Sequence, residues 1–317
     1  MSLGLMDENL VPFAVTTALV GGAMIWAASS LLKGKGSKKN AVALDNTKFQ
    51  PFKLVKKVEI SHDTRIYRFA LKHPEQKLGL PIGQHMYLRT TLPSGEVVQR
   101  AYTPISSDDD LGYFDLLIKV YNKGVHPKFP DGGKLTQAID AMAIGDSIDV
   151  KGPSGRLEYC GKGNLTIKGP KDTVRKIKVK RLGLIAGGSG ITPMMQIVRA
   201  ILKDANDNVE LYLLFGNQTE EDILMRNEIE IAMKERAGQL KVWYTVDRPP
   251  ATGWTYSSGF IDEAMLKANM PSALIGGDES TRMETMVLMC GPGPMISYAC
   301  KPNLEKLGFT PEQMFAF

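Results

Sequence analysis

Cysteine and histidine are scarce in this chain, which has three cysteines and four histidines in 317 residues. Cys160, Cys290 and Cys300 show no Cys-x-x-Cys spacing, and the histidines form no metal-ligand pattern. This scarcity excludes a disulfide scaffold and argues against structural zinc or an iron–sulfur cluster, so we expect no metal. It is also typical of proteins from a reducing compartment.

A strong charge of one sign is lacking as well. The formal net charge is +5, and the chain beyond its N-terminal region keeps a positive balance. No basic cluster is interleaved with aromatic residues, so nucleic acid is not an expected partner. The mild positive balance favours an acidic partner, although an ordinary solvated surface explains it equally well.

Residues 10–32 contain no charged side chain, and about 20 apolar residues suffice to cross a bilayer. We therefore expect an N-terminal membrane anchor, a transmembrane helix, within residues 1–32. A cleaved signal peptide is the alternative, but Asp7 and Glu8 are unlike its basic start. A flexible basic linker at 33–47 places the rest of the chain in the cytosol, on the mitochondrial outer membrane or the endoplasmic reticulum.

Short β-like segments separated by turn signals fill the next stretch, which we assign to one domain at 48–160. The segments span 52–60, 64–70, 84–91, 97–102, 113–120 and 147–151. Short strands at this spacing predict an antiparallel β-barrel. Residues 161–180 are expected to connect this barrel to a second domain.

Strands and helical patterns alternate from 181 to 317, with strands at 209–216 and 240–246. This alternation predicts a parallel-sheet α/β domain with helices on both faces, so the fold class is β + α/β. Ligands of such sheets bind at the carboxyl ends of the strands. Two glycine turns, and Asp247 after the strand 240–246, fall at that edge.

The first glycine turn reads GGSGITPM at 187–194 and contains Gly188 and Thr192. Glycine lets the backbone approach a ligand, and a helix N-terminus offers free N–H groups to phosphate. A purely structural turn is the alternative, because the pattern is not Gly-x-Gly-x-x-Gly. Thr192 can cap the helix, approach a cofactor ring, or do both.

The second turn, at 290–294, reads CGPGP and is followed by Met295. Gly291, Pro292 and Met295 are candidates for cofactor contact. Cys290 is either a buried small apolar residue or a thiol beside a bound ring, and nothing in the sequence indicates covalent thiol chemistry.

Five motifs occur in a fixed order along the chain. They are RAYTPISS at 100–107, KVYNKGVHPKFPDGGKLTQAID at 119–140, GPSGRLEY at 152–159, GGSGITPM at 187–194 and CGPGPMI at 290–296. In this order they resemble the ferredoxin-reductase-like flavoproteins, most of all the NADH-cytochrome b5 reductase family, from about residue 48 onward. The resemblance implies FAD held mainly by the barrel, NADH bound by the second domain, and cytochrome b5 or a similar haem protein as partner.

The resemblance places one segment of the barrel along the flavin, namely Arg100, Ala101, Tyr102, Thr103 and Pro104. The fork of Arg100 suits a pyrophosphate, and the Thr103 hydroxyl can reach the flavin nitrogen that accepts hydride. An ordinary strand surface is the alternative for these residues.

Lys119 and Tyr121 share one face at a strand end, which by resemblance lies near the flavin and the nicotinamide. Phe129 is a cofactor-binding candidate in the loop that follows, whereas His126 is equally well a plain surface group. Free N–H groups at Gly133, Lys134, Leu135 and Thr136 can receive an FAD phosphate, or these residues form an ordinary helix entry. The candidates for catalysis are Thr103, Lys119 and Cys290.

Asp247 bears on the choice between NADH and NADPH. A carboxylate at this edge accepts hydrogen bonds from the adenosine ribose and repels a 2′-phosphate, which favours NADH. Arg248 beside it can act in the opposite sense if it turns inward. The resembling family usually reads CGPPPM in the second turn, and Gly293 replaces the middle proline here, which predicts a looser loop.

These observations together predict an enzyme that takes a hydride from NADH onto FAD and passes single electrons to cytochrome b5. Three alternatives are a reductase module for another haem acceptor, as in nitrate reductase, a soluble NADPH reductase, and a flavin-free nucleotide-binding interaction protein. An intact RAYTP segment argues against the last of these.

Overall fold

The computed structural model describes residues 42–125, 130–274 and 276–317. The chain divides into two units, Met1–Lys39 and Asn40–Phe317, and the described residues belong to the second. The expected anchor, most of the expected linker, and Phe129 and His126 lie outside the described residues. Within the part that the structure describes, no helix combines the length and the apolar character that spanning a membrane requires.

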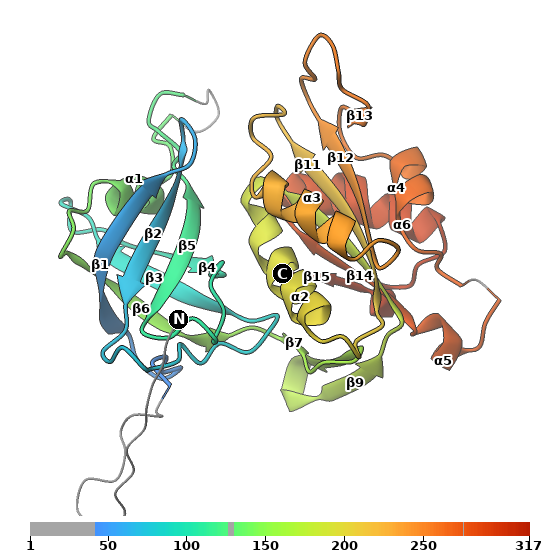
Figure 1. Cartoon of the computed structure of the whole chain (residues 1–317), viewed down its shortest axis with the longest axis horizontal. Coiled ribbons are helices and arrows are strands. Elements are labelled where there is room, and N and C mark those ends of the chain that lie inside the picture. Colours follow the sequence, from blue (N-terminus) through green and yellow to red (C-terminus); the bar gives the residue numbers. More distant parts are fainter. Residues whose placement is uncertain (1–41, 126–129, 275) are drawn as a thin grey trace, which may run out of the picture. The chain divides into compact units, whose positions relative to one another are not determined.

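Six strands form an antiparallel sheet in the first part of the chain (Figure 1). They are β1 (Gln50–Glu59), β2 (Thr64–Ala70), β3 (His85–Thr91), β4 (Val97–Tyr102), β5 (Tyr113–Lys119) and β6 (Ser147–Ser154), with helix α1 (Lys134–Asp140) between β5 and β6. The strand order is β4-β3-β6-β1-β2-β5. The expected strands are therefore present, within a few residues at their ends.

Apolar side chains from all parts of this sheet pack into one core. Val98 of β4, Leu54 of β1 and Phe114 of β5 are buried in the same cluster. The ring of Phe114 lies 5.4 Å from that of Phe52 and 5.3 Å from that of Phe69, measured between centroids. Because β4 and β5 stand at opposite ends of the strand order, the sheet curls around this shared core.

A small antiparallel sheet follows, made of β7 (Leu157–Tyr159), β8 (Asn164–Lys168) and β9 (Val174–Lys178), with a short 3-10 helix η2 (Pro170–Asp172) before β9. The stretch 161–180, expected as a connection, thus contains two strands. The Tyr159 hydroxyl donates to Asp207 and accepts a 2.9 Å hydrogen bond from the Gly163 N–H. These bonds join the small sheet to the loop between α2 (Ile191–Lys203) and strand β11 (Glu210–Asn217) of the next large sheet.

The second large sheet is parallel in every pairing, with the order β13-β12-β11-β10-β14-β15. Its strands are β10 (Arg181–Gly187), β11 (Glu210–Asn217), β12 (Leu240–Val246), β13 (Ser257–Ser258), β14 (Thr285–Cys290) and β15 (Met314–Ala316). Residues 182–187 of β10 are all buried, as expected for a central strand covered on both faces.

Helices cover both faces of this sheet (Figure 1). Side chains of α2 (Ile191–Lys203) and α3 (Arg226–Glu235) pack with one face, and those of α4 (Glu263–Asn269) and α6 (Lys301–Lys306) pack with the other. The remaining elements are η3 (Gly188–Gly190), α5 (Glu279–Arg282), the π-helix η4 (Met295–Cys300) and η5 (Pro311–Gln313). The second glycine turn is therefore followed by a π-helical turn that α6 continues.

A hydrogen bond joins the C-terminal end of α1 to strand β2 of the antiparallel sheet. The buried Tyr67 donates a 2.7 Å hydrogen bond to the Asp140 carboxylate, which also pairs with Lys57 at 2.8 Å. Tyr67→Phe removes this bond, so we expect the free energy of unfolding to fall by about 1–3 kcal/mol in a urea titration. Tyr113→Phe, which removes a longer 3.3 Å bond to Asp110, is the control, and equal losses in both variants would contradict the assignment.

Candidate functional site

Two glycine turns pack against each other at the carboxyl edge of the parallel sheet. β10 and β14 are neighbours with Ala186 opposite Cys290, so the turns that follow them meet. A Cβ atom on Gly190 would lie 2.2 Å from the carbonyl oxygen of Cys290, and one on Gly187 would lie 2.8 Å from Pro292. Only glycine permits this approach of one backbone to the other. The first glycine turn therefore has a structural role, whether or not it also binds a ligand.

The same edge retains room for a ligand. Gly188 has a φ of +53°, and a Cβ placed there would meet no atom within 4 Å. The side-chain amide of Asn217, at the end of β11, has both polar atoms buried without a hydrogen-bond partner among the described residues. Buried polar atoms of this kind are normally paired. A polar group of a bound dinucleotide would supply the missing partner, so the residues present fit such a cofactor.

Thr192 is the second residue of α2, and its buried hydroxyl donates a 3.2 Å hydrogen bond to the carbonyl of Ser189. The N-cap of α2 is Gly190, with no side-chain cap. Thr192 therefore stabilises the turn from within the helix and is not its N-cap residue.

Cys290 lies at the end of β14 and is half-buried. Burial raises the pKa of its thiol to about 11, so the group stays neutral near pH 7. Met295 reaches back over the first turn, because its sulfur lies 2.8 Å from the position of a Cβ on Gly187. The second turn thus presents a thiol, a thioether and backbone, and no charged group, to the edge.

Asp247 follows β12 and is exposed at the same edge. Its backbone N–H donates a 3.1 Å hydrogen bond to the carbonyl of Asn217. Desolvation by the surrounding protein raises the pKa of its carboxyl, and Arg248 acts in the opposite direction. The Arg248 guanidinium lies 3.4 Å from the amide oxygen of Gln218, so it is turned toward this neighbour.

The RAYTP segment ends β4 and leads toward β5. Arg100 and Ala101 are exposed, Tyr102 is half-buried, and Thr103 and Pro104 are buried. The Arg100 guanidinium donates only to the adjacent carbonyl of Gln99, at 2.7 Å, and makes no ion pair within the described residues. Burial, aided by the nearby Tyr121, raises the pKa of Tyr102 to about 12. An exposed cationic fork beside a neutral aromatic ring can bind a phosphate and a ring system together.

The start of α1 is tied to the end of β5. The Gly133 N–H donates to the carbonyl of Tyr121 at 2.8 Å, and the Thr136 hydroxyl donates to the carbonyl of Gly133 at 2.9 Å. Lys134 is exposed and pairs with Glu96 at 2.8 Å, whereas Leu135 is buried in the core. Tyr121 remains exposed. The backbone at 133–136, where we expect a phosphate to bind, therefore lies beside Tyr121. Lys134 in this segment is already paired with Glu96.

Lys119 ends β5, and its ammonium is paired with two carboxylates. Its ammonium lies 2.8 Å from Asp63 and 2.7 Å from Asp222, and all three side chains are at most 16% exposed. Burial lowers the pKa of Lys119, but its hydrogen bonds to Asp222 and Asp63 outweigh burial and raise that pKa overall. The ammonium is therefore held charged by two carboxylates that sequence reasoning missed.

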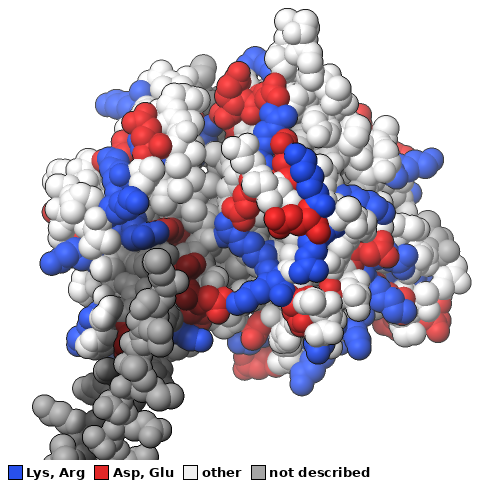
Figure 2. Space-filling model, in the orientation of Figure 1, with Lys and Arg blue, Asp and Glu red and all other residues white. Residues whose placement is uncertain are grey.

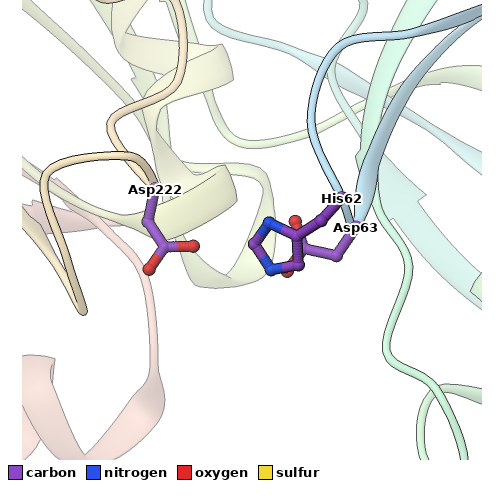
Figure 3. Close-up of side chains that lie close together, drawn as sticks. All are labelled: His62, Asp63 and Asp222. Carbon is purple, nitrogen blue, oxygen red and sulfur yellow. The ribbon is translucent and has the colours of Figure 1, made fainter.

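His62, Asp63 and Asp222 lie close together, as Figure 3 shows. Their side-chain geometry resembles that of a metal site, because the ligand atoms lie within 4.8 Å of one another. However, Lys119 already balances both carboxylates, and the His62 ring is largely exposed, 3.4 Å from Asp63. We interpret the group as an ion-pair cluster.

Helix α2 of the parallel sheet contacts loops of the antiparallel sheet. The Gly83 N–H donates a buried 2.7 Å hydrogen bond to the amide oxygen of Gln196, and Arg199 donates to the carbonyl of Ile105. Strand β5 also contacts η3. Strand β5, which ends at Lys119, therefore contacts the first glycine turn.

The structure brings most of the predicted residues that it describes into two groups. One group surrounds the end of β4 and the start of α1, and the other surrounds the edge where β10, β12 and β14 end. Lys119 lies between them, bound to an acid from each side. Positively and negatively charged side chains alternate over the face in Figure 2.

Comparison with known domain families defines the class of protein. The oxidoreductase FAD-binding domain family matches residues 51–159, and the oxidoreductase NAD-binding domain family matches residues 184–301. The chain is therefore an oxidoreductase built from an FAD-binding domain and an NAD-binding domain.

Individual relatives define the family more narrowly. The chain is 50% identical to NADH-cytochrome b5 reductase 2 of Xenopus laevis over 90% of this chain and 93% of that protein. It is also 50% identical to NADH-cytochrome b5 reductase 3 of Rattus norvegicus, over 87% and 89%. The structure of the cytochrome b5 reductase domain of Ulva prolifera nitrate reductase matches with a TM-score of 0.79 and 43% identity, over 87% of this chain and 100% of that one. The chain belongs to the NADH-cytochrome b5 reductase family.

The position of Asp247 predicts its role in cofactor choice. If Asp247 binds the ribose as the sequence predicts, Asp247→Ala removes a hydrogen bond to a charged group, so KM for NADH should rise on the order of tenfold. KM for NADPH should rise less, because the repulsion of its 2′-phosphate is removed at the same time. Steady-state kinetics with both cofactors measures this, with Arg248→Ala as the neighbouring control. Unchanged discrimination would mean that another residue contacts the ribose.

The raised pKa of the Cys290 thiol predicts that alkylating reagents modify it slowly near neutral pH. With a pKa of about 11, only about one thiol in 1,000 is ionised at pH 8, so iodoacetamide should modify Cys290 very slowly. The exposed Cys160 should be modified first, as peptide mass mapping would show. Labelling of Cys290 should accelerate up to about pH 11, and rapid labelling at pH 7 would contradict the neutral thiol.

Proposed function

We propose that this protein is a membrane-anchored reductase that transfers electrons from NADH, through bound FAD, to cytochrome b5. Bound FAD would supply the chemistry, because it takes two electrons with a hydride and returns them singly. The observation that carries the proposal is the contact of strand β5 with the first glycine turn, which would bring the two proposed cofactor sites next to each other. Family membership supports both cofactors.

Residues of the antiparallel sheet would hold the flavin. The exposed guanidinium of Arg100 would bind the pyrophosphate, and Ala101, Tyr102, Thr103 and Pro104 would line the ring. The backbone N–H groups near Gly133, Lys134, Leu135 and Thr136 would serve the phosphate end. Thr103 is buried, so its hydroxyl could donate or accept a hydrogen bond at the flavin ring in a place that bulk water does not reach. Phe129 remains a proposal from the sequence.

The parallel sheet would bind NADH along its carboxyl edge. Gly188, Thr192 and Asn217 would face the centre of the dinucleotide, and Asp247 would accept hydrogen bonds from the ribose. Gly291, Pro292 and Met295 would shape the wall of the nicotinamide pocket, with the neutral thiol of Cys290 beside the ring. In this assignment Cys290 excludes water and performs no covalent step.

We further propose the domain limits and the location of the enzyme. Residues 48–160 would form the FAD-binding domain, 161–180 the connection and 181–317 the NADH-binding domain. Residues 1–32 would anchor the chain, with the linker 33–47 and both domains in the cytosol. The uncharged stretch at 10–32 and the lysines that follow it support this arrangement.

Absorption spectroscopy of the purified full chain tests the function. We expect visible flavin bands that NADH bleaches under anaerobic conditions, and that NADPH bleaches much more slowly. Oxidised cytochrome b5 should then restore the bands. A protein that shows no flavin bands even after FAD is supplied would contradict the proposal, and bleaching without reoxidation by cytochrome b5 would assign a different acceptor.

A further inference from the structure

Lys119 is held by one carboxylate from each side of the boundary between the two sheets. Asp63 lies in the turn between β1 and β2 of the antiparallel sheet, and Asp222 lies in the loop after β11 of the parallel sheet. Lys119 ends β5, and β5 contacts the first glycine turn, η3. The ammonium therefore connects the two sheets at the place where both cofactors are proposed to meet.

Each carboxylate is oriented by its own loop before it reaches Lys119. In Asp222, Oδ2 accepts hydrogen bonds from the Thr219 N–H at 3.1 Å and hydroxyl at 2.9 Å, while Oδ1 faces the ammonium at 2.7 Å. In Asp63, Oδ1 accepts from Ser61 and Thr64 at 3.2 and 2.9 Å, while Oδ2 faces the ammonium. Each acid thus uses one oxygen to fix its position and the other to hold Lys119.

The degree of burial distinguishes this contact from ordinary surface pairs. The side chains of Lys119, Asp63 and Asp222 are 16%, 16% and 10% exposed. A second pair across the same boundary, Lys203 with Asp109, has side chains that are 68% and 62% exposed. Exposed pairs contribute little because water screens them, whereas breaking a buried pair leaves an uncompensated charge.

We propose that Asp222, with Asp63, is a positioning residue for hydride transfer: it fixes the Lys119 ammonium across the sheet boundary and so sets the distance between the flavin and nicotinamide sites. This inference rests on the proposed function. Asp222 acts through Lys119 and contacts no reacting atom. Since misplacement of reactants by about 1 Å can cost roughly 100-fold in rate, losing this contact should affect the transfer step more than the binding of NADH.

Stopped-flow reduction of the flavin by NADH, under anaerobic conditions, tests this role in the full chain. In Asp222→Ala the limiting rate of flavin reduction should fall by between roughly tenfold and roughly 100-fold, with a smaller change in the apparent Kd for NADH. Asp222→Glu should restore part of the rate. Asp109→Ala, which breaks the exposed pair across the same boundary, is the matched control and should change the rate less than about twofold.

Combining the variants separates positioning from general damage. Lys119→Met should also slow reduction, and adding Asp222→Ala to it should cause no further loss, because Asp222 acts through that ammonium. Additive losses, an effect no larger than that of Asp109→Ala, or tighter NADH binding with an unchanged rate would each overturn the proposal. FAD content and thermal unfolding show whether a variant folds. Thr219→Val and Asp222→Asn give the same comparison if Asp222→Ala does not fold.

The wild-type reaction keeps this test separate from the proposed function. If NADH does not reduce the flavin of the wild-type protein, the proposed function is wrong. If NADH reduces the wild type and the Asp222 variants equally fast, only the positioning role is wrong.

Discussion

The contact between the two glycine turns is the constraint on which the rest of the site depends. A single methyl group at Gly190 would lie 2.2 Å from the carbonyl oxygen of Cys290, so one of the two backbones would have to shift. Because β10 and β14 are adjacent and in register, their ends must meet there. Gly188, Thr192, Cys290 and Met295 owe their common location to this meeting of backbones.

Helix α2 links that edge to the other half of the protein. It begins at the first glycine turn, packs on the parallel sheet, and contacts the antiparallel side through Gln196 and Arg199. The N-terminal end of the helix thus belongs to the proposed nucleotide site. Gln196 and Arg199, further along the helix, bond to loops of the antiparallel sheet, where the flavin is proposed to bind. A flavoprotein that transfers hydride between two cofactors requires such a shared element, since the rings must meet at a fixed distance.

The sequence was sufficient to predict the order of the two sheets, because alternation and turn signals are local. The strands at 64–70 and 97–102 match β2 and β4. It did not indicate the strands β8 and β9 within 161–180, because each has only five residues and at most two buried side chains. The ordered motifs predicted the family and its cofactors, and the comparisons confirm both. The role of each site residue stays a prediction.

The environment of Lys119 could not be predicted, because its two acids lie far from it in the chain. Asp222 is 103 residues away, and no periodic pattern relates a strand end to a loop of another sheet. The sequence did indicate that Asp222 lies near the ligand-binding edge, since it follows the end of β11 and parallel strands end at a common edge. For Thr192 the prediction was local and partly right. The sequence placed it near the start of a helix, but it did not indicate that Gly190 is the N-cap residue.

The second glycine turn also contains a position that is sterically free. A Cβ on Gly293 would meet no atom within 4 Å, in contrast to Gly190 and Gly291. A side chain at either of those two glycines would require the backbone of the opposite turn to move as well, so a substitution there needs a second change to accompany it. Gly293 can change alone, so the sequence of this turn can diversify at that position while the backbone contact between the two turns stays intact.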